Sequence, residues 1–131
     1  MEARWAVRPG PQAPGQVRRG LVRLGSSMDT KLMDWLQVLV SELVTNSVRH
    51  AGLDAREQVQ VTVRMTGDRV QVEVADPGRG FAPIARPLPT PDAEGGWGLF
   101  LLDKVSDRWG VTRGDRETRV WFELSRETPP P

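Results

Sequence analysis

The chain has no cysteine and a single histidine, His50, among its 131 residues. The lack of cysteine excludes a disulfide framework and any thiolate metal site. One histidine is also too few for the histidine-based sites that hold zinc. A chain without disulfides suits a reducing compartment, and we therefore expect a cytoplasmic location.

An excess of charge and long apolar runs are missing as well. Lys and Arg number 18 against 17 acidic residues, the net charge is +1, and the basic residues are scattered along the chain. This balance predicts no direct nucleic-acid partner. No run reaches the roughly 18 apolar residues of a membrane-spanning helix, and the first residues lack the apolar core of a signal peptide. We expect no membrane partner.

Of the 131 residues, 38% are hydrophobic, which is enough for the hydrophobic core of one domain over 1–131. Periodicity predicts helices at 16–24, 29–51 and 97–107, and strands at 4–7, 59–65, 70–76, 108–113 and 118–125. Strands and helices cluster in this order rather than alternate strictly. The fold class is therefore α+β: a two-layer sandwich whose mostly antiparallel sheet carries helices on one face.

The helix at 29–51 has the strongest local pattern. Leu32, Leu36, Leu39 and Leu43 follow the spacing of one apolar stripe. Ser26, Ser27 and Asp29 are the candidates for its N-cap.

Between the strand at 70–76 and the helix at 97–107 the chain is rich in proline and glycine. A connection of this length without periodicity is usually a functional lid or is disordered, and we predict a lid over about 79–96. The last residues, 126–131, are predicted to fray.

A carboxylate and an amide stand four residues apart in the helical stretch SELVTNSVRHA (41–51). Glu42 and Asn46 then lie on one side of the helix, at the edge of the leucine stripe. An amide oxygen suits Mg²⁺, and a carboxylate can accept a proton from an attacking hydroxyl. An ordinary solvent-exposed helix face explains the same pair without any chemistry.

Two glycine-rich motifs follow. In DPGRGF (76–81), Asp76 ends a strand and can accept a hydrogen bond from an exocyclic amine, while Gly78 and Gly80 permit close approach of the backbone to a ligand. Turn chemistry alone also explains this motif. In EGGWGLFLL (94–102), glycines run into a helix whose N-terminal N–H groups suit phosphate, although a flexible loop is the alternative. Neither motif matches a P-loop or dinucleotide fingerprint.

Three motifs, in this order, resemble those of the GHKL (Bergerat-fold) ATPases: E-x-x-x-N, then D-x-G-x-G-F, then G-x-G-L before a helix. The resemblance covers about residues 16–125. In the residues of its first two motifs and in its short length, the chain resembles the bacterial anti-sigma-factor serine/threonine kinases in particular. The resemblance implies an α/β sandwich that binds ATP and Mg²⁺ between its helices and a lid.

The resemblance also implies roles for single residues. Asn46 would bind the Mg²⁺ that bridges the phosphates, and Glu42 would be the general base. Asp76 would read the adenine amino group in a pocket shaped by Gly78 and Gly80.

For the second glycine motif, the resemblance implies that Gly96, Gly98 and Leu99 contact phosphate through their backbone and that Gly95 hinges the lid. Thr118 stands where the family has a threonine at the adenine end, here without the usual neighbouring glycine.

The implied function is phosphorylation of an anti-sigma-factor antagonist by a kinase that also binds a sigma factor, and the resemblance allows for a homodimer. The alternative is a catalytically silent module that binds ATP and sequesters a regulatory partner.

Overall fold

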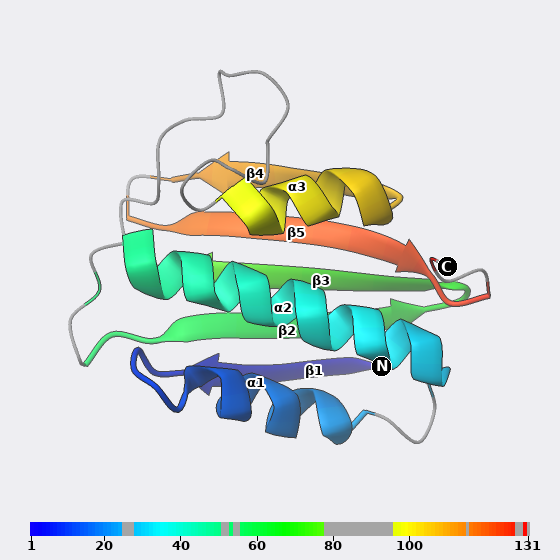
Figure 1. The fold of residues 1–131 in the computed structure, drawn as a ribbon, viewed down its shortest axis with the longest axis horizontal. Coiled ribbons are helices and arrows are strands. Elements are labelled where there is room, and N and C mark those ends of the chain that lie inside the picture. Colours follow the sequence, from blue (N-terminus) through cyan, green and yellow to red (C-terminus); the bar gives the residue numbers. More distant parts are fainter. Residues whose placement is uncertain are drawn as a thin grey trace.

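The part of the chain that the structure describes forms a five-stranded sheet with three helices on one of its faces (Figure 1). The computed structural model describes residues 1–24, 28–50, 53, 56–77, 96–114, 116–127 and 130. Its elements are β1 (Glu2–Val7), α1 (Ala13–Val22), α2 (Thr30–His50), β2 (Val59–Thr66), β3 (Arg69–Asp76), α3 (Gly96–Val105), β4 (Arg108–Arg113) and β5 (Thr118–Ser125). The α+β sandwich predicted from the sequence is confirmed.

The strands lie in the order β1-β2-β3-β5-β4, and all four pairings are antiparallel. A tight turn joins β2 to β3, and Gly67 in this turn has a φ of +56°, which a residue with a side chain rarely adopts. Side chains alternate along each strand, so that valines face the helices and polar residues face away. The sheet therefore has one apolar face and one polar face.

The long helix α2 lies over the middle of the sheet (Figure 1). Its predicted stripe, Leu32, Leu36, Leu39 and Leu43, is at most 2% exposed. Each such leucine contributes about 1.5–3 kcal/mol through burial. The stripe, together with the valines of β2 and β3, forms the centre of the hydrophobic core.

Asp29 caps the start of α2. Its carboxylate oxygen Oδ1 accepts hydrogen bonds from the backbone N–H groups of Lys31, at 2.9 Å, and Leu32, at 3.3 Å. Such a cap contributes about 1 kcal/mol, because it satisfies N–H groups that have no partner within the helix. Of the three cap candidates, Ser26 and Ser27 lie outside the described residues.

The first helix begins earlier than predicted. It starts at Ala13 rather than at Gln16, inside a segment whose prolines and glycines suggest a turn. Pro14 stands in the first turn of α1, where a proline is favoured because its missing N–H would have no helical partner anyway. The proline therefore opens this helix instead of preceding it.

The C-terminal tail, predicted to fray, is bonded at two described residues. The N–H of Arg126 donates to the carbonyl of Asp68 at 2.6 Å, and the indole N–H of Trp35 donates to the carbonyl of Pro130 at 3.2 Å. The predicted lid over 79–96 lies outside the described residues except for Gly96. Among the helices described, none has the length and apolar character needed to span a membrane.

Two glycines of α1 give a matched test of its packing on β1. A methyl group at Gly20 would overlap the indole ring of Trp5, whereas one at Gly15 would meet only the flexible end of Arg19, at 3.3 Å. We expect Gly20→Ala to lower the free energy of unfolding in urea by about 1–3 kcal/mol. Gly15→Ala should leave it unchanged or raise it by up to about 1 kcal/mol. Equal effects of the two substitutions would contradict this packing.

Candidate functional site

The polar residues that the fold buries lie at one end of the sandwich. Among the described residues, the polar side chains that are at most 4% exposed are Asn46, Ser47, Asp76 and Thr118. They come from the end of α2, the end of β3 and the start of β5, which meet at the left of Figure 1. Burying polar groups costs free energy. Their collection at one end of an otherwise apolar core therefore indicates a site.

Asp76 and Thr118 are direct neighbours across the β3–β5 pairing. Both follow the alternation of the buried valines on their strands, Val74 and Val120, so both side chains face the helical layer. The structure thus brings together two predicted site residues that are 42 positions apart in the sequence.

Glu42 and Asn46 lie one turn apart on α2 and differ in exposure. Asn46 is buried at 4% exposure, whereas Glu42 is half-buried and lines a groove that Arg18 of α1 also borders. Val38 and Ser41 of α2 line the same groove. The carboxylate is therefore accessible from solvent, while the neighbouring amide is enclosed.

The start of α3 packs directly on this pair. A Cβ atom at Gly98 would lie 3.0 Å from Nδ2 of Asn46 and 3.3 Å from Cβ of Glu42. Leu99 is buried next to it, at 5% exposure. The first N–H groups of a helix have no partner within it and favour anions. The first turn of α3 therefore brings anion-binding groups against Glu42 and Asn46.

Some predicted site residues lie outside the described residues, namely Gly78, Gly80 and Gly95. Gly96 is the first residue of α3. Sequence reasoning missed Ser47, which is buried at 4% exposure beside Asn46. A serine within a helix carries no pattern that would have singled it out.

The described residues suit a metal ion that takes most of its ligands from elsewhere. No group of three or more His, Cys, Asp or Glu side chains with the geometry of a metal site occurs among them. Mg²⁺ typically uses one or two protein oxygens and completes its octahedron with phosphates and water. The side-chain amide of Asn46 is buried and its nitrogen lies close to the start of α3, so the oxygen of the same amide can supply one such ligand.

The described part of the sandwich thus has a buried amide, a buried aspartate and a helix N-terminus at one end. The chain belongs to the histidine kinase-like ATPase domain family, whose profile matches residues 8–124. The resemblance to the GHKL ATPases that the motifs indicate is thereby confirmed.

Several curated relatives share the name serine-protein kinase RsbW. The protein from Bacillus licheniformis is 33% identical and the one from Bacillus velezensis is 35% identical, each over 111 residues. Each match covers 74% of this chain and 69% of the relative. This chain is therefore similar to proteins named as serine-protein kinases over most of its length.

Solved structures support the same fold. The histidine kinase domain of the blue-light activated histidine kinase from Erythrobacter litoralis EL346 aligns with a TM-score of 0.60 at 24% identity, covering 88% of this chain and 60% of that one. The histidine kinase AdeS of Acinetobacter baumannii aligns with a TM-score of 0.57 at 9% identity. At these identities the likeness shows the fold alone.

Gly98 gives a direct test of the α2–α3 contact. Gly98→Ala places a methyl group against the Asn46 amide, so either the amide or the start of α3 must move by a few tenths of an ångström. Overpacking of about 1–3 kcal/mol corresponds to a loss of about 5- to 150-fold in affinity when it falls on a binding site. We expect calorimetry to show this loss for Mg-ATP. Gly15→Ala, the same change in a helix away from the site, should bind normally, and normal binding by both variants would contradict the contact.

Proposed function

We propose that the protein is an ATP-dependent serine/threonine kinase that transfers the γ-phosphoryl group of ATP to a hydroxyl of a partner protein. The observation that carries the proposal is the difference between Glu42 and Asn46. One turn of α2 presents a solvent-accessible glutamate and an enclosed amide, and the Cβ atom of Glu42 and the amide nitrogen of Asn46 lie against the first turn of α3. Phosphoryl transfer requires alignment and charge neutralisation more than covalent catalysis, and few groups suffice for it.

Glu42 is proposed as the general base. The acceptor hydroxyl oxygen forms a bond to the γ-phosphorus, the bond from that phosphorus to the β,γ-bridging oxygen breaks, and ADP leaves with the electron pair. The hydroxyl proton passes to the Glu42 carboxylate. The groove beside Glu42 provides solvent access through which this carboxylate can return its proton.

Asn46 and the start of α3 are proposed to hold the phosphates. The amide oxygen of Asn46 would be a ligand of Mg²⁺, which neutralises phosphate charge when bound. The backbone N–H groups at Gly98 and Leu99 would donate to phosphate oxygens, since the positive end of the helix dipole also lies there. Gly96 would contribute in the same way, and Gly95 would act as the hinge of the lid.

Asp76 and Thr118 are proposed to form the adenine end of the site. The Asp76 carboxylate, which is buried at 3% exposure, would accept a hydrogen bond from the exocyclic amine of adenine. Thr118 lies directly opposite Asp76 in the register and can support the same edge of the base. Gly78 and Gly80 would shape the remaining wall.

The partners are proposed from the resemblance to the anti-sigma-factor kinases. The acceptor would be an anti-sigma-factor antagonist, the second partner would be a sigma factor, and the kinase could act as a homodimer. The similarity to proteins named serine-protein kinase supports the reaction type. The cytoplasmic location remains a prediction.

The Glu42→Gln variant tests the chemistry. Removing the base while keeping the shape should slow phosphoryl transfer by about 10²–10⁴-fold, with the affinity for Mg-ATP nearly unchanged. Transfer from γ-labelled ATP to a purified acceptor protein measures the first effect and calorimetry the second. Asp68→Asn, the same loss of charge in the exposed turn between β2 and β3, is the matched control. Wild-type transfer rates in Glu42→Gln would exclude Glu42 as the base.

The same experiment separates the kinase from a silent binding module. A module that only binds ATP and sequesters a partner would show no transfer in the wild-type protein, and Glu42→Gln would then change neither ATP affinity nor partner binding.

Asn46→Ala tests the metal site. Loss of a metal ligand should weaken Mg-dependent ATP binding by at least about tenfold, while the weaker binding of ATP in EDTA should change little. Titration calorimetry with and without Mg²⁺ gives both values. Gln71→Ala removes an amide from the opposite face of the sheet and should leave both unchanged. An equal loss with and without Mg²⁺ would mean that Asn46 supports the fold of the site rather than the metal.

A further inference from the structure

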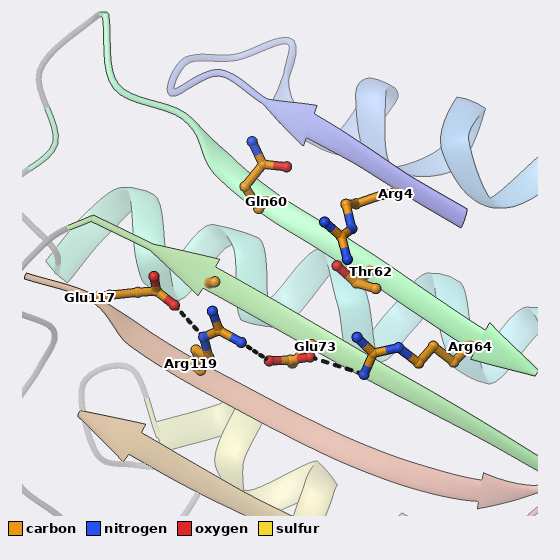
Figure 2. Close-up of a pocket in the computed structure, with 8 residues that line it drawn as sticks. Arg4, Gln60, Thr62, Arg64, Glu73, Glu117 and Arg119 are labelled. Atoms are coloured by element: carbon orange, nitrogen blue, oxygen red, sulfur yellow. Dashed lines mark hydrogen bonds and ion pairs between the residues drawn. The ribbon is translucent and has the colours of Figure 1, made fainter. Parts of the chain in front are cut away.

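The polar face of the sheet carries a hollow that the proposed function does not use (Figure 2). It has a volume of about 180 Å³ and is centred on β2 and β3. Its lining residues are Arg4, Gln60, Thr62, Arg64, Glu73, Ala75, Glu117 and Arg119. The three helices lie on the other face of the sheet (Figure 1), so this hollow opens away from them.

The carboxylates around the hollow are engaged by arginines. Glu73 lies between Arg119, at 2.7 Å, and Arg64, at 3.6 Å, and Arg119 also pairs with Glu117. Arg64 pairs with Glu2 at 2.6 Å, and this hydrogen bond is the main reason that the pKa of Glu2 is lowered. The acidic groups are thus largely occupied within the sheet.

Guanidinium groups form most of the outer layer of the hollow, together with the carboxylate of Glu117, whose side chain is 43% exposed. The side chain of Glu73 is 19% exposed, whereas those of Arg64, Arg119 and Arg4 are 40%, 50% and 62% exposed. The guanidinium of Arg4 has five N–H donors. Among the described residues it forms a single ion pair, with Glu2 at 3.2 Å, and Glu2 lies closer to Arg64, at 2.6 Å. Figure 2 shows the Arg4 guanidinium pointing towards Thr62. On this side of the hollow, the guanidinium N–H donors therefore outnumber the carboxylate oxygens that are available to accept from them.

We propose that the hollow binds a carboxylate side chain from an acidic segment of a partner protein. A guanidinium presents parallel N–H groups that match the two oxygens of a carboxylate. Arg4 would be the principal contact, Arg119 would flank it, and Thr62 and Gln60 lie beside Arg4 to complete the hydrogen bonding. The volume suffices for one acidic side chain.

The charge pattern disfavours two other occupants. A nucleic acid binds through a row of phosphates, whereas this hollow has room for one charged side chain, with Glu2 and Glu73 engaged beside it. The aromatic side chain on this face, Trp121, is covered by Gly110 and by the guanidinium of Arg108 at 5.9 Å from its ring, so a base could not stack on it freely. A second copy of the chain would bring the same exposed arginines against this surface.

The hollow and the proposed nucleotide site lie on opposite faces of the sheet, next to the same end of β3 and β5. Ala75 and Arg119 line the hollow, and their neighbours Asp76 and Thr118 face the helices. A segment bound in the hollow therefore leaves the helical face open. Its binding does not depend on ATP, so this inference and the proposed function can fail separately.

The test is a binding titration without nucleotide. A fluorescein-labelled hexaglutamate peptide is titrated with the protein at low salt and followed by anisotropy, alongside hexaglutamine and a short oligothymidylate. We expect saturable binding of hexaglutamate and at least fivefold weaker binding by the variant Arg4→Gln/Arg119→Gln. The control, Arg19→Gln/Arg23→Gln, removes two exposed arginines, one in α1 and one directly after it, and should bind within twofold of wild type. Circular dichroism confirms that both variants are folded.

Three results would overturn the proposal. Equal weakening in both double variants would show that binding follows net charge alone. Tighter binding of oligothymidylate, lost in Arg4→Gln/Arg119→Gln, would assign the surface to nucleic acid. A dimer in sedimentation analysis that dissociates in the same variant would assign it to a second copy of the chain.

Discussion

The close contact between α2 and α3 is the constraint on which the proposed site depends. The two helices approach one another at Gly98, where even a methyl group would press on Asn46 and Glu42. This contact brings the N-terminus of one helix, whose first N–H groups have no partner within the helix, against the polar end of the other. Without it, the amide, the carboxylate and the N–H groups would be separate features of an ordinary sandwich.

The alternation of the strands extends this organisation to the rest of the sheet. The same period of two that buries Val74 and Val120 also places Asp76 and Thr118 under the helices, and it places Ala75 and Arg119 on the opposite face. One stretch of β3 and β5 thus supplies a nearly dry polar site on one side and a solvated charge network on the other. The two surfaces differ because only one of them is covered by helices (Figure 1).

Much of the fold was predictable from the sequence, because its signals are periodic and local. The valine alternation of β2 and β3 and the leucine stripe of α2 gave their elements to within a residue or two. The helix α1 starts three residues before the predicted position, because prolines and glycines usually mark turns, whereas Pro14 stands in the first turn of this helix. In the site, Glu42, Asn46 and Asp76 stood out through their motifs. Ser47 and the arginine-lined hollow did not, because burial and clustering across strands appear only after folding.

The unequal exposure of Glu42 and Asn46 suits two different chemical tasks. A general base must shed the proton that it takes up, so it has to communicate with solvent, and the groove beside Glu42 permits this. A metal ligand benefits from the opposite environment, since electrostatic interactions strengthen where water is excluded, and Asn46 is buried. A neutral amide also avoids the cost of burying a charge, which a carboxylate at position 46 would incur. The spacing of one helical turn therefore places each group in the environment that its proposed role requires.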